Sequence, residues 1–150
     1  MFQLIKIEYG RDNVPEPMSL PVAASKTITV GMALVIDSTT HTLTPASGDC
    51  SVTHIALENK TTKAGDYLLC YAVYPQMIFE VPLSAYSAST QVLGAQLQIA
   101  TTGNAITATA ASGTTLVSSS GTAVTTKFGA KIINTLGAKA VGDRVLVKLA

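Results

Sequence analysis

The sequence predicts an all-β fold, a single-domain β-sandwich or β-barrel with an extended N-terminal arm and little or no helix. One observation is a recurring signature, in which a glycine precedes an apolar residue three places on and another two places later. It occurs at Gly31, Gly65, Gly94 and Gly142. A second is residues 61–82, the most apolar and aromatic stretch, whose residue types favour strands. The third is that no segment has a sustained 3.6-residue apolar stripe, so no long helix is expected.

Each glycine signature indicates a turn followed by a strand. Glycine adopts a positive φ at low cost, and alternate side chains of the strand that follows face one core. Generic turn-to-strand junctions would explain the four copies equally well, and either interpretation favours an all-β fold.

The N-terminal region divides into a strand and an arm. Residues 2–7 carry apolar and polar residues in partial alternation, which predicts a first strand at a sheet edge. Residues 10–24 contain Pro15, Pro17 and Pro21. Because proline denies helix and ladder hydrogen bonds, this segment is expected to be an extended arm. The predicted organisation is therefore residues 1–25 as strand and arm and residues 26–150 as the β domain, with an ordinary long loop as the alternative to an arm.

Short strands are expected from there to the centre of the chain. They cover residues 27–30, 33–37, 41–45 and 50–57. Residues 67–74 form the next strand, Pro75 and Gln76 supply a tight connection, and residues 77–81 return as a second strand. The prediction is a buried hairpin on which the other strands pack.

The second half of the chain is small, polar and uncharged for a long span. Residues 84–90 are expected to form a loop or a single helical turn, and the later strands are expected at residues 91–100, 105–110, 116–117, 123–128, 131–136 and 144–149. The first two of these strands form a predicted hairpin. No charged residue occurs between Glu80 and Lys127. A neutral sheet with exposed edges tends to associate, so we expect it to be covered by copies of itself or by a larger assembly. A composition bias without a partner is the alternative.

The totals exclude several classes of protein. The chain has 150 residues, a net charge of +1 and 13% charged residues, which fits one domain without a basic surface for nucleic acid. No apolar run reaches transmembrane length, and the first residues lack a signal-peptide core. We therefore expect no nucleic-acid or membrane partner, and synthesis in the cytosol.

Catalytic, cofactor-binding and metal-binding constellations are not found in the sequence, so no enzyme is predicted. His54 lies in an apolar strand and is expected to be a hydrogen-bonded structural residue, whereas His41 follows a turn and is expected to be solvated. Cys50 and Cys70 have no metal-site spacing and are expected to be reduced, with a disulfide left open. Aspartates beside turns or glycines are expected to accept hydrogen bonds from backbone N–H groups; they are Asp37, Asp49, Asp66 and Asp143.

Several short apolar pieces follow the arm in a fixed order, at residues 31–36, 55–57, 64–69, 79–83 and 137–147. This order resembles the small capsid decoration (cement) proteins of tailed bacteriophages. The resemblance implies a β-rich, non-catalytic virion protein, and the residues themselves indicate no cofactor or metal. It implies binding to the major capsid protein on the outside of the head, commonly as a homotrimer. Residues 101–126 are longer and more neutral than the family leads one to expect.

Under this hypothesis the chain is made in the host cytoplasm, resides on the capsid surface and stabilises the head. The segment expected to reach the shell is pre-stiffened by proline, which lowers the cost of ordering it on binding. Its residues are Asn13, Val14, Pro15, Glu16, Pro17, Met18 and Leu20. The alternative is that this segment merely wraps its own domain.

Two other functions stay open at this point. One is a virion fibre or adhesin module that binds host-surface glycans through Thr, Ser and Asn side chains, although the chain has no Trp for sugar stacking. The other is a small β-barrel enzyme, for which His54 and Asp66 would be the residues to change.

Overall fold

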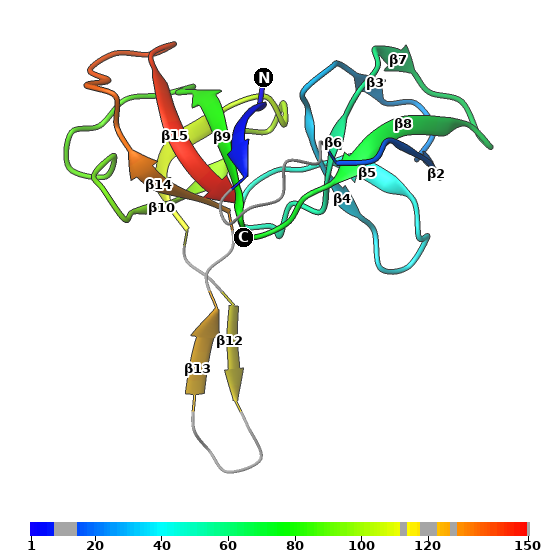
Figure 1. Ribbon diagram of the computed structural model, residues 1–150. Coiled ribbons are helices and arrows are strands. Elements are labelled where there is room, and N and C mark those ends of the chain that lie inside the picture. The colour runs from blue at the N-terminus through cyan, green and yellow to red at the C-terminus, as the bar shows by residue number, and fades with distance from the viewer. Residues whose placement is uncertain (8–14, 112–113, 118–122, 127–128, 150) are drawn as a thin grey trace.

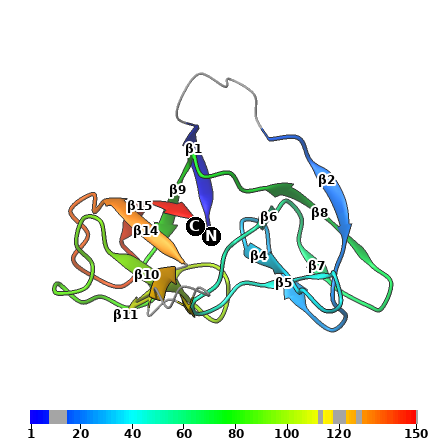
Figure 2. The same ribbon diagram turned by 90° about the horizontal axis from the view of Figure 1, so that it is seen from below.

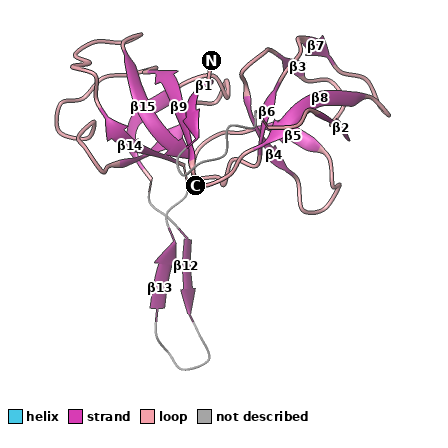
Figure 3. Cartoon of the chain, in the orientation of Figure 1, coloured by secondary structure: helices cyan, strands magenta, loops and turns pink. Residues whose placement is uncertain are grey.

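The computed structural model describes residues 1–7, 15–111, 114–117, 123–126 and 129–149. All the regular elements in these residues are β-strands, so the predicted all-β, single-domain class is confirmed (Figure 3). The strands are β1 (Gln3–Ile7), β2 (Met18–Pro21), β3 (Thr27–Ile28), β4 (Ala33–Ile36), β5 (Leu43–Pro45), β6 (His54–Ala56), β7 (Lys60–Thr61), β8 (Tyr67–Ala72), β9 (Met77–Pro82), β10 (Gln96–Ile99), β11 (Ile106–Ala110), β12 (Thr114–Val117), β13 (Ala123–Thr126), β14 (Ala130–Asn134) and β15 (Arg144–Leu149).

The strands form two main sheets and two small ones. The five-stranded sheet has the order β2-β8-β6-β4-β5, and the six-stranded sheet has the order β1-β9-β15-β14-β10-β11. The pairs β3-β7 and β12-β13 each stand as a two-stranded sheet. In Figure 1 the two main sheets lie side by side, and the β12–β13 hairpin projects away from both. Figure 2 shows the chain beginning between the two main sheets.

The predicted central hairpin is wrong, although its two strands are present. β8 pairs with β2 and β6, whereas β9 pairs with β1 and β15. Residues 73–76 therefore carry the chain from one main sheet to the other, with the Met77 N–H donating to the Tyr74 carbonyl at 3.0 Å. A proline turn indicates where a strand ends but not which sheet the next strand enters. By contrast, the predicted hairpin of β10 and β11 is confirmed.

The four glycine signatures are confirmed as turns. The φ angles are 74° at Gly31, 84° at Gly65, 84° at Gly94 and 88° at Gly142. In each turn the residue after the glycine donates its N–H to the carbonyl two residues before the glycine, at 3.0, 3.2, 3.0 and 3.3 Å respectively. This is the type II arrangement, which requires a positive φ at its third residue. A strand begins two residues after every one of these glycines.

The four turns belong to two copies of one arrangement. The strand order β2-β8-β6-β4-β5 in one main sheet has the same sequence-order pattern as β9-β15-β14-β10-β11 in the other. We name residues 18–72 the first unit and residues 77–149 the second unit. Each unit contains two of the glycine turns, one before β4 or β10 and one before its last strand, β8 or β15.

Strand registers also match between the units. In the first unit Leu34 lies opposite His54, and in the second unit Leu97 lies opposite Ala130. Counting from the turn glycines, Leu34 and Leu97 occupy the same position of equivalent strands. A register shift in β14 accommodates one extra residue in the second unit. The chain therefore contains an internal structural duplication.

Each unit closes on itself through one parallel bridge. Val22, just after β2, bridges Leu43 of β5, and Leu83, just after β9, bridges Ile106 of β11. The residue that follows donates its N–H to the same partner carbonyl, at 3.0 Å in the first unit and 2.8 Å in the second. Both sheets are thus curled into small barrels, as a single linking bridge between their edge strands requires.

The two units share one apolar core, which makes them a single domain. The cluster that fills the second unit also contains Ala33, Ile55 and Tyr71 from the first unit. The interior of the first unit holds a second cluster, of Val22, Ile28, Met32, Leu34, Leu43, Ala56, Leu68 and Cys70. Backbone hydrogen bonds also cross the junction, because the Ala33 N–H donates to the Gly103 carbonyl at 2.8 Å.

Three features lie outside the duplicated arrangement. β1 adds to the free edge of β9, and the Phe2 N–H donates to the Gly31 carbonyl of the first unit at 2.8 Å. β3 and β7 pair only in the first unit, and β12 and β13 pair only in the second. Residues 1–7 and 18–21 are therefore integrated into the main sheets and do not form a segment apart from the β domain.

Candidate interaction surfaces

The segment predicted to contact a shell lies partly before β2 and partly within it. Asn13 and Val14 lie outside the described residues, Pro15 is buried, and Glu16 and Pro17 are exposed. The last two predicted contact residues belong to β2 and are half-buried against β8; they are Met18 and Leu20. The expectation that proline would keep this whole segment out of a ladder is wrong for residues 18–21.

Proline positions explain how β2 joins a sheet. The Val22 N–H donates to the Asp66 carbonyl, toward β8, at 3.0 Å, so the alternation of an antiparallel ladder directs the N–H of every second residue of β2 toward β8. Pro21 falls at a position that faces away, and Pro17 continues the same alternation. Ser19 is then the one residue of β2 with an outward N–H. The prolines thus sit where they cost the ladder nothing and block the free edge.

Each unit has one end at which its glycine turns gather, which we name its turn end. In the first unit β4 and β8 begin there and the antiparallel β6 ends there. In the second unit β10 and β15 begin there and β14 ends there. The two turn ends are equivalent in backbone but not in side chains.

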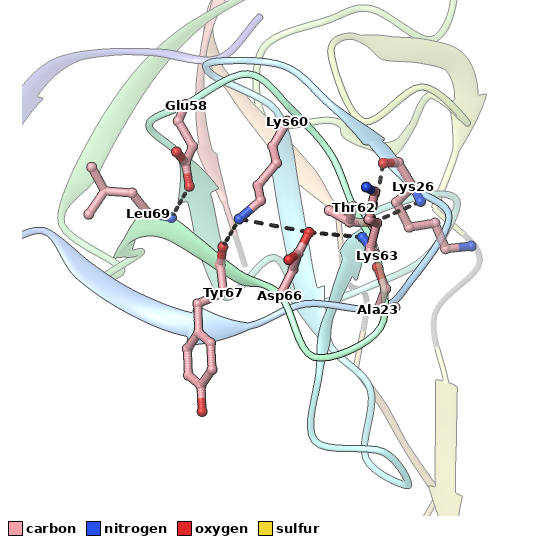
Figure 4. Close-up of polar contacts among 9 residues, drawn as sticks. All are labelled: Ala23, Lys26, Glu58, Lys60, Thr62, Lys63, Asp66, Tyr67 and Leu69. Atoms are coloured by element: carbon pink, nitrogen blue, oxygen red, sulfur yellow. Dashed lines mark hydrogen bonds and ion pairs between the residues drawn. The ribbon is translucent and has the colours of Figure 1, made fainter.

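The turn end of the first unit is charged (Figure 4). Lys60 Nζ donates to the Tyr67 carbonyl at 2.7 Å and lies 3.8 Å from Asp66 Oδ2. The Lys63 N–H donates to the same carboxylate at 2.8 Å. Asp66 therefore fixes the turn before β8, and Lys60 spans it.

Two further side chains in Figure 4 satisfy backbone groups near this end. Thr62 is buried, donates its hydroxyl to the Ala23 carbonyl at 2.6 Å and accepts the Lys26 N–H at 2.9 Å. Glu58 accepts the Leu69 N–H at 2.8 Å. These contacts hold strands and turns together, which is a structural role.

The turn end of the second unit exposes more apolar surface than that of the first, where Val30 is 41% and Tyr67 58% exposed. We name this group the apolar end; its exposed fractions are 49% for Val92, 71% for Leu93, 51% for Leu136 and 66% for Val141. The turn itself is held as in the first unit, because Asp143 accepts the N–H groups that precede it at 2.8 and 3.0 Å. The backbone therefore does not require these apolar residues, and a group of exposed apolar side chains marks an interaction surface.

The apolar end was missed from the sequence, although a signal for it was present. Leu93, Leu136 and Val141 each directly precede a glycine with φ of 84°, 74° or 88°. A residue in that place occupies the outer corner of a turn and projects from the surface. An apolar residue directly before a turn glycine therefore indicates exposed apolar surface.

The β12–β13 hairpin is the other candidate surface. Its four residue pairs run from Thr114 opposite Thr126 to Val117 opposite Ala123. It lies in the connection between β11 and β14, which corresponds to residues 47–53 of the first unit. The first unit makes that connection without a hairpin, so the hairpin is an insertion that the barrel does not need.

Several titratable side chains of the described residues have structural roles. His54 is buried with Nδ1 2.9 Å from Thr53 Oγ1, which confirms a hydrogen-bonded histidine, and burial lowers its pKa below the usual value. Burial raises the pKa of the Cys70 thiol to about 11, and Cys50 and Cys70 are both free thiols. Asp37 accepts the Thr39 and Thr40 N–H groups, as expected for an aspartate at a turn. Among the residues described, no three His, Cys, Asp or Glu side chains are grouped to hold a metal ion.

Comparisons with known proteins leave the family open. No family model matches the chain, and no curated protein matches it significantly. The described part of the chain contains no helix long and apolar enough to cross a membrane.

Proposed function

We propose that this chain is a structural virion protein that binds the outer surface of a phage capsid and stabilises the head. The apolar pieces whose order resembles decoration proteins supply β4, β6, β8, β9 and β15, which are strands of both units. The proposed partners are the major capsid protein and two further copies of the chain, which together form a homotrimer at each site. The protein is then made in the host cytoplasm and resides on the virion.

The apolar end carries this proposal. Leu93 and Val141 are 71% and 66% exposed, whereas at the equivalent turns of the first unit Val30 is 41% exposed and the small Ala64 lies beside the Lys60–Asp66 ion pair. Burying such side chains against a partner contributes roughly 1.5–3 kcal/mol each. The proposed shell contact is therefore the apolar end, with the segment preceding β2 as a second contact.

Stabilisation follows from mass action. A protein that binds the assembled shell and not its separated subunits adds free energy to the assembled state. The shared core and the backbone hydrogen bonds between the units make one stiff body. Such a body resists separation of two shell subunits when it lies across the seam between them, and repetition over many sites supplies avidity.

Co-sedimentation with heads that lack the protein tests the proposal. The wild-type chain should pellet with heads at a saturable copy number. Leu93→Ser with Val141→Ser should weaken binding by about a hundredfold or more, because two buried apolar contacts are lost. The matched control changes the equivalent end of the first unit, Lys60→Ser with Lys63→Ser, and should bind as the wild type does.

Two results would contradict the proposal. A wild-type chain that stays in the supernatant at every concentration, with retention on a glycan array, would favour the adhesin alternative. Equal losses in the two double variants would show that the apolar end is not the contact.

The arm is tested separately by replacing residues 8–16 with a Gly-Ser linker of equal length, which leaves β1 and β2 intact.

A further inference from the structure

Within the described residues, the edge strands of the two main sheets are protected against pairing with another chain. β1 has a register shift between Leu4 and Lys6, and Lys6 is exposed. The edge of β2 carries Pro17 and Pro21 at outward positions. β5 and β11 are closed by the parallel bridges. Bulges, lysines and prolines are the usual devices that stop a sheet edge from adding a foreign strand.

The β12–β13 hairpin has none of these devices in its sequence. Its strands are Thr-Thr-Leu-Val and Ala-Val-Thr-Thr, without proline or charge. Within the described residues neither strand pairs with anything but the other, and the hairpin has regular register over its whole length. An isolated two-stranded hairpin is marginally stable in water and gains from a third strand.

We infer that the β12–β13 hairpin is a self-association element, whose free edges pair with the same hairpin of a second copy of this chain. A second copy fits because the interacting strands are uncharged, so like surfaces meet without electrostatic repulsion. Backbone hydrogen bonds between strand edges supply the contact. The inference stands independently of capsid binding, because it concerns the purified chain alone.

The geometry limits the assemblies to a small set. Pairing of β12 with β12 of a partner, or of β13 with β13, gives a two-fold dimer. Pairing of β12 with β13 of the next copy gives a ring where the rotation closes and an open filament where it does not. Because no charge lies between Glu80 and Lys127, the dissociation constant should change little with salt, unlike that of an interface built on ion pairs.

Two variants of the full chain test the inference by sedimentation equilibrium. The first replaces residues 112–129 with residues 47–53, the connection that the first unit uses between equivalent strands. The second is Thr114→Lys with Thr125→Lys, which places a charge on each strand without making the lysines directly opposite. The matched control carries two lysines at exposed positions elsewhere, Ala88→Lys with Thr102→Lys.

The wild-type chain and the control should associate at micromolar concentrations, in low and high salt alike. Both hairpin variants should raise the dissociation constant roughly tenfold or more. A wild-type chain that is monomeric throughout contradicts the inference, as does a folded hairpin variant that associates as strongly as the wild type. If the variant with residues 112–129 replaced does not fold, the dissociation constant of the Thr114→Lys, Thr125→Lys variant tests the inference. A monomeric chain that needs the hairpin to bind heads would assign it to the shell instead and overturn self-association.

Discussion

The first and second units build the same barrel and place different chemistry on it. Asp66 and Asp143 hold equivalent turns through the same kind of carboxylate-to-backbone hydrogen bonds. Beside those turns the first unit has Lys60 paired with Asp66, whereas the second exposes Leu93 and Val141. The duplicated backbone accepts either surface.

This difference distinguishes residues that the fold requires from residues that are available to bind a partner. A residue type that recurs in both units, such as the turn glycine or the capping aspartate, is required by the backbone. A residue type found in one unit only is free to serve a partner. The apolar end and the β12–β13 hairpin both belong to the second unit, so that unit carries the main proposed shell contact and the proposed self-association element.

The largest expected effect tests whether the units form one cooperative body. Leu34 and Leu97 are fully buried at equivalent positions. Leu34→Ala and Leu97→Ala should each lower the free energy of unfolding by about 3 kcal/mol, because each leaves a cavity. Urea unfolding followed by circular dichroism should show one transition in both variants. Two transitions, of which each variant moves only one, would show that the units unfold independently.

A second pair of variants compares the junction with a surface turn. A Cβ at Gly103 would lie 2.9 Å from Met32 Cγ and 3.0 Å from the Ala33 oxygen, whereas one at Gly65 meets nothing within 4 Å. Both glycines have a positive φ, of 67° and 84°. Gly65→Ala should cost about 1 kcal/mol from backbone strain alone, and Gly103→Ala about 3 kcal/mol. Equal losses in thermal unfolding would show that the units are not closely apposed at Gly103.

A third comparison concerns buried polar residues with similar tasks in the two units. Thr62 fixes the segment after β2, and Gln91 donates to the Ala85 carbonyl at 2.6 Å in the segment after β9. Thr62→Val and Gln91→Leu should each cost about 2 kcal/mol, because both leave backbone groups without partners. Thr61→Val is the exposed control and should change the free energy of unfolding by less than about 0.5 kcal/mol. If only one of the two variants, Thr62→Val or Gln91→Leu, lowers the free energy of unfolding, the two side chains do not have equivalent roles.

The smallest expected effect is a difference in alkaline stability. Burial raises the Cys70 pKa to about 11 from 9.0, so stability from the buried neutral thiol is present below pH 9 and is lost as the pH rises through 11. The variant Cys70→Val introduces the residue type that the second unit has at the equivalent position, Val147. Between pH 8 and 10 the variant should lose about 1 kcal/mol less than the wild type. Identical pH profiles would place the thiol in contact with solvent.

Local chemistry made much of the fold predictable. The turn glycines locate the starts of β4, β8, β10 and β15. This works because the glycine with positive φ and the alternating apolar side chains of the strand lie within a few residues of each other in the sequence. The aspartates Asp37, Asp66 and Asp143 likewise cap turns as their positions indicate.

Pairing between distant strands was not predictable in the same way. Tyr67–Ala72 and Met77–Pro82 adjoin in the chain but enter different sheets, which depends on partners far away in sequence. The prolines near β2 were informative only once their alternate spacing could be set against the ladder with β8. The apolar end required knowing which ends of three strands meet.

Electron cryomicroscopy of heads mixed with the chain tests the central claim most directly. The account predicts ordered density across the seams between neighbouring shell subunits, with the apolar end, Val92, Leu93, Leu136 and Val141, facing the shell. Heads that remain bare at saturating concentration, or density in which the lysine-bearing end of the first unit faces the shell, would contradict it.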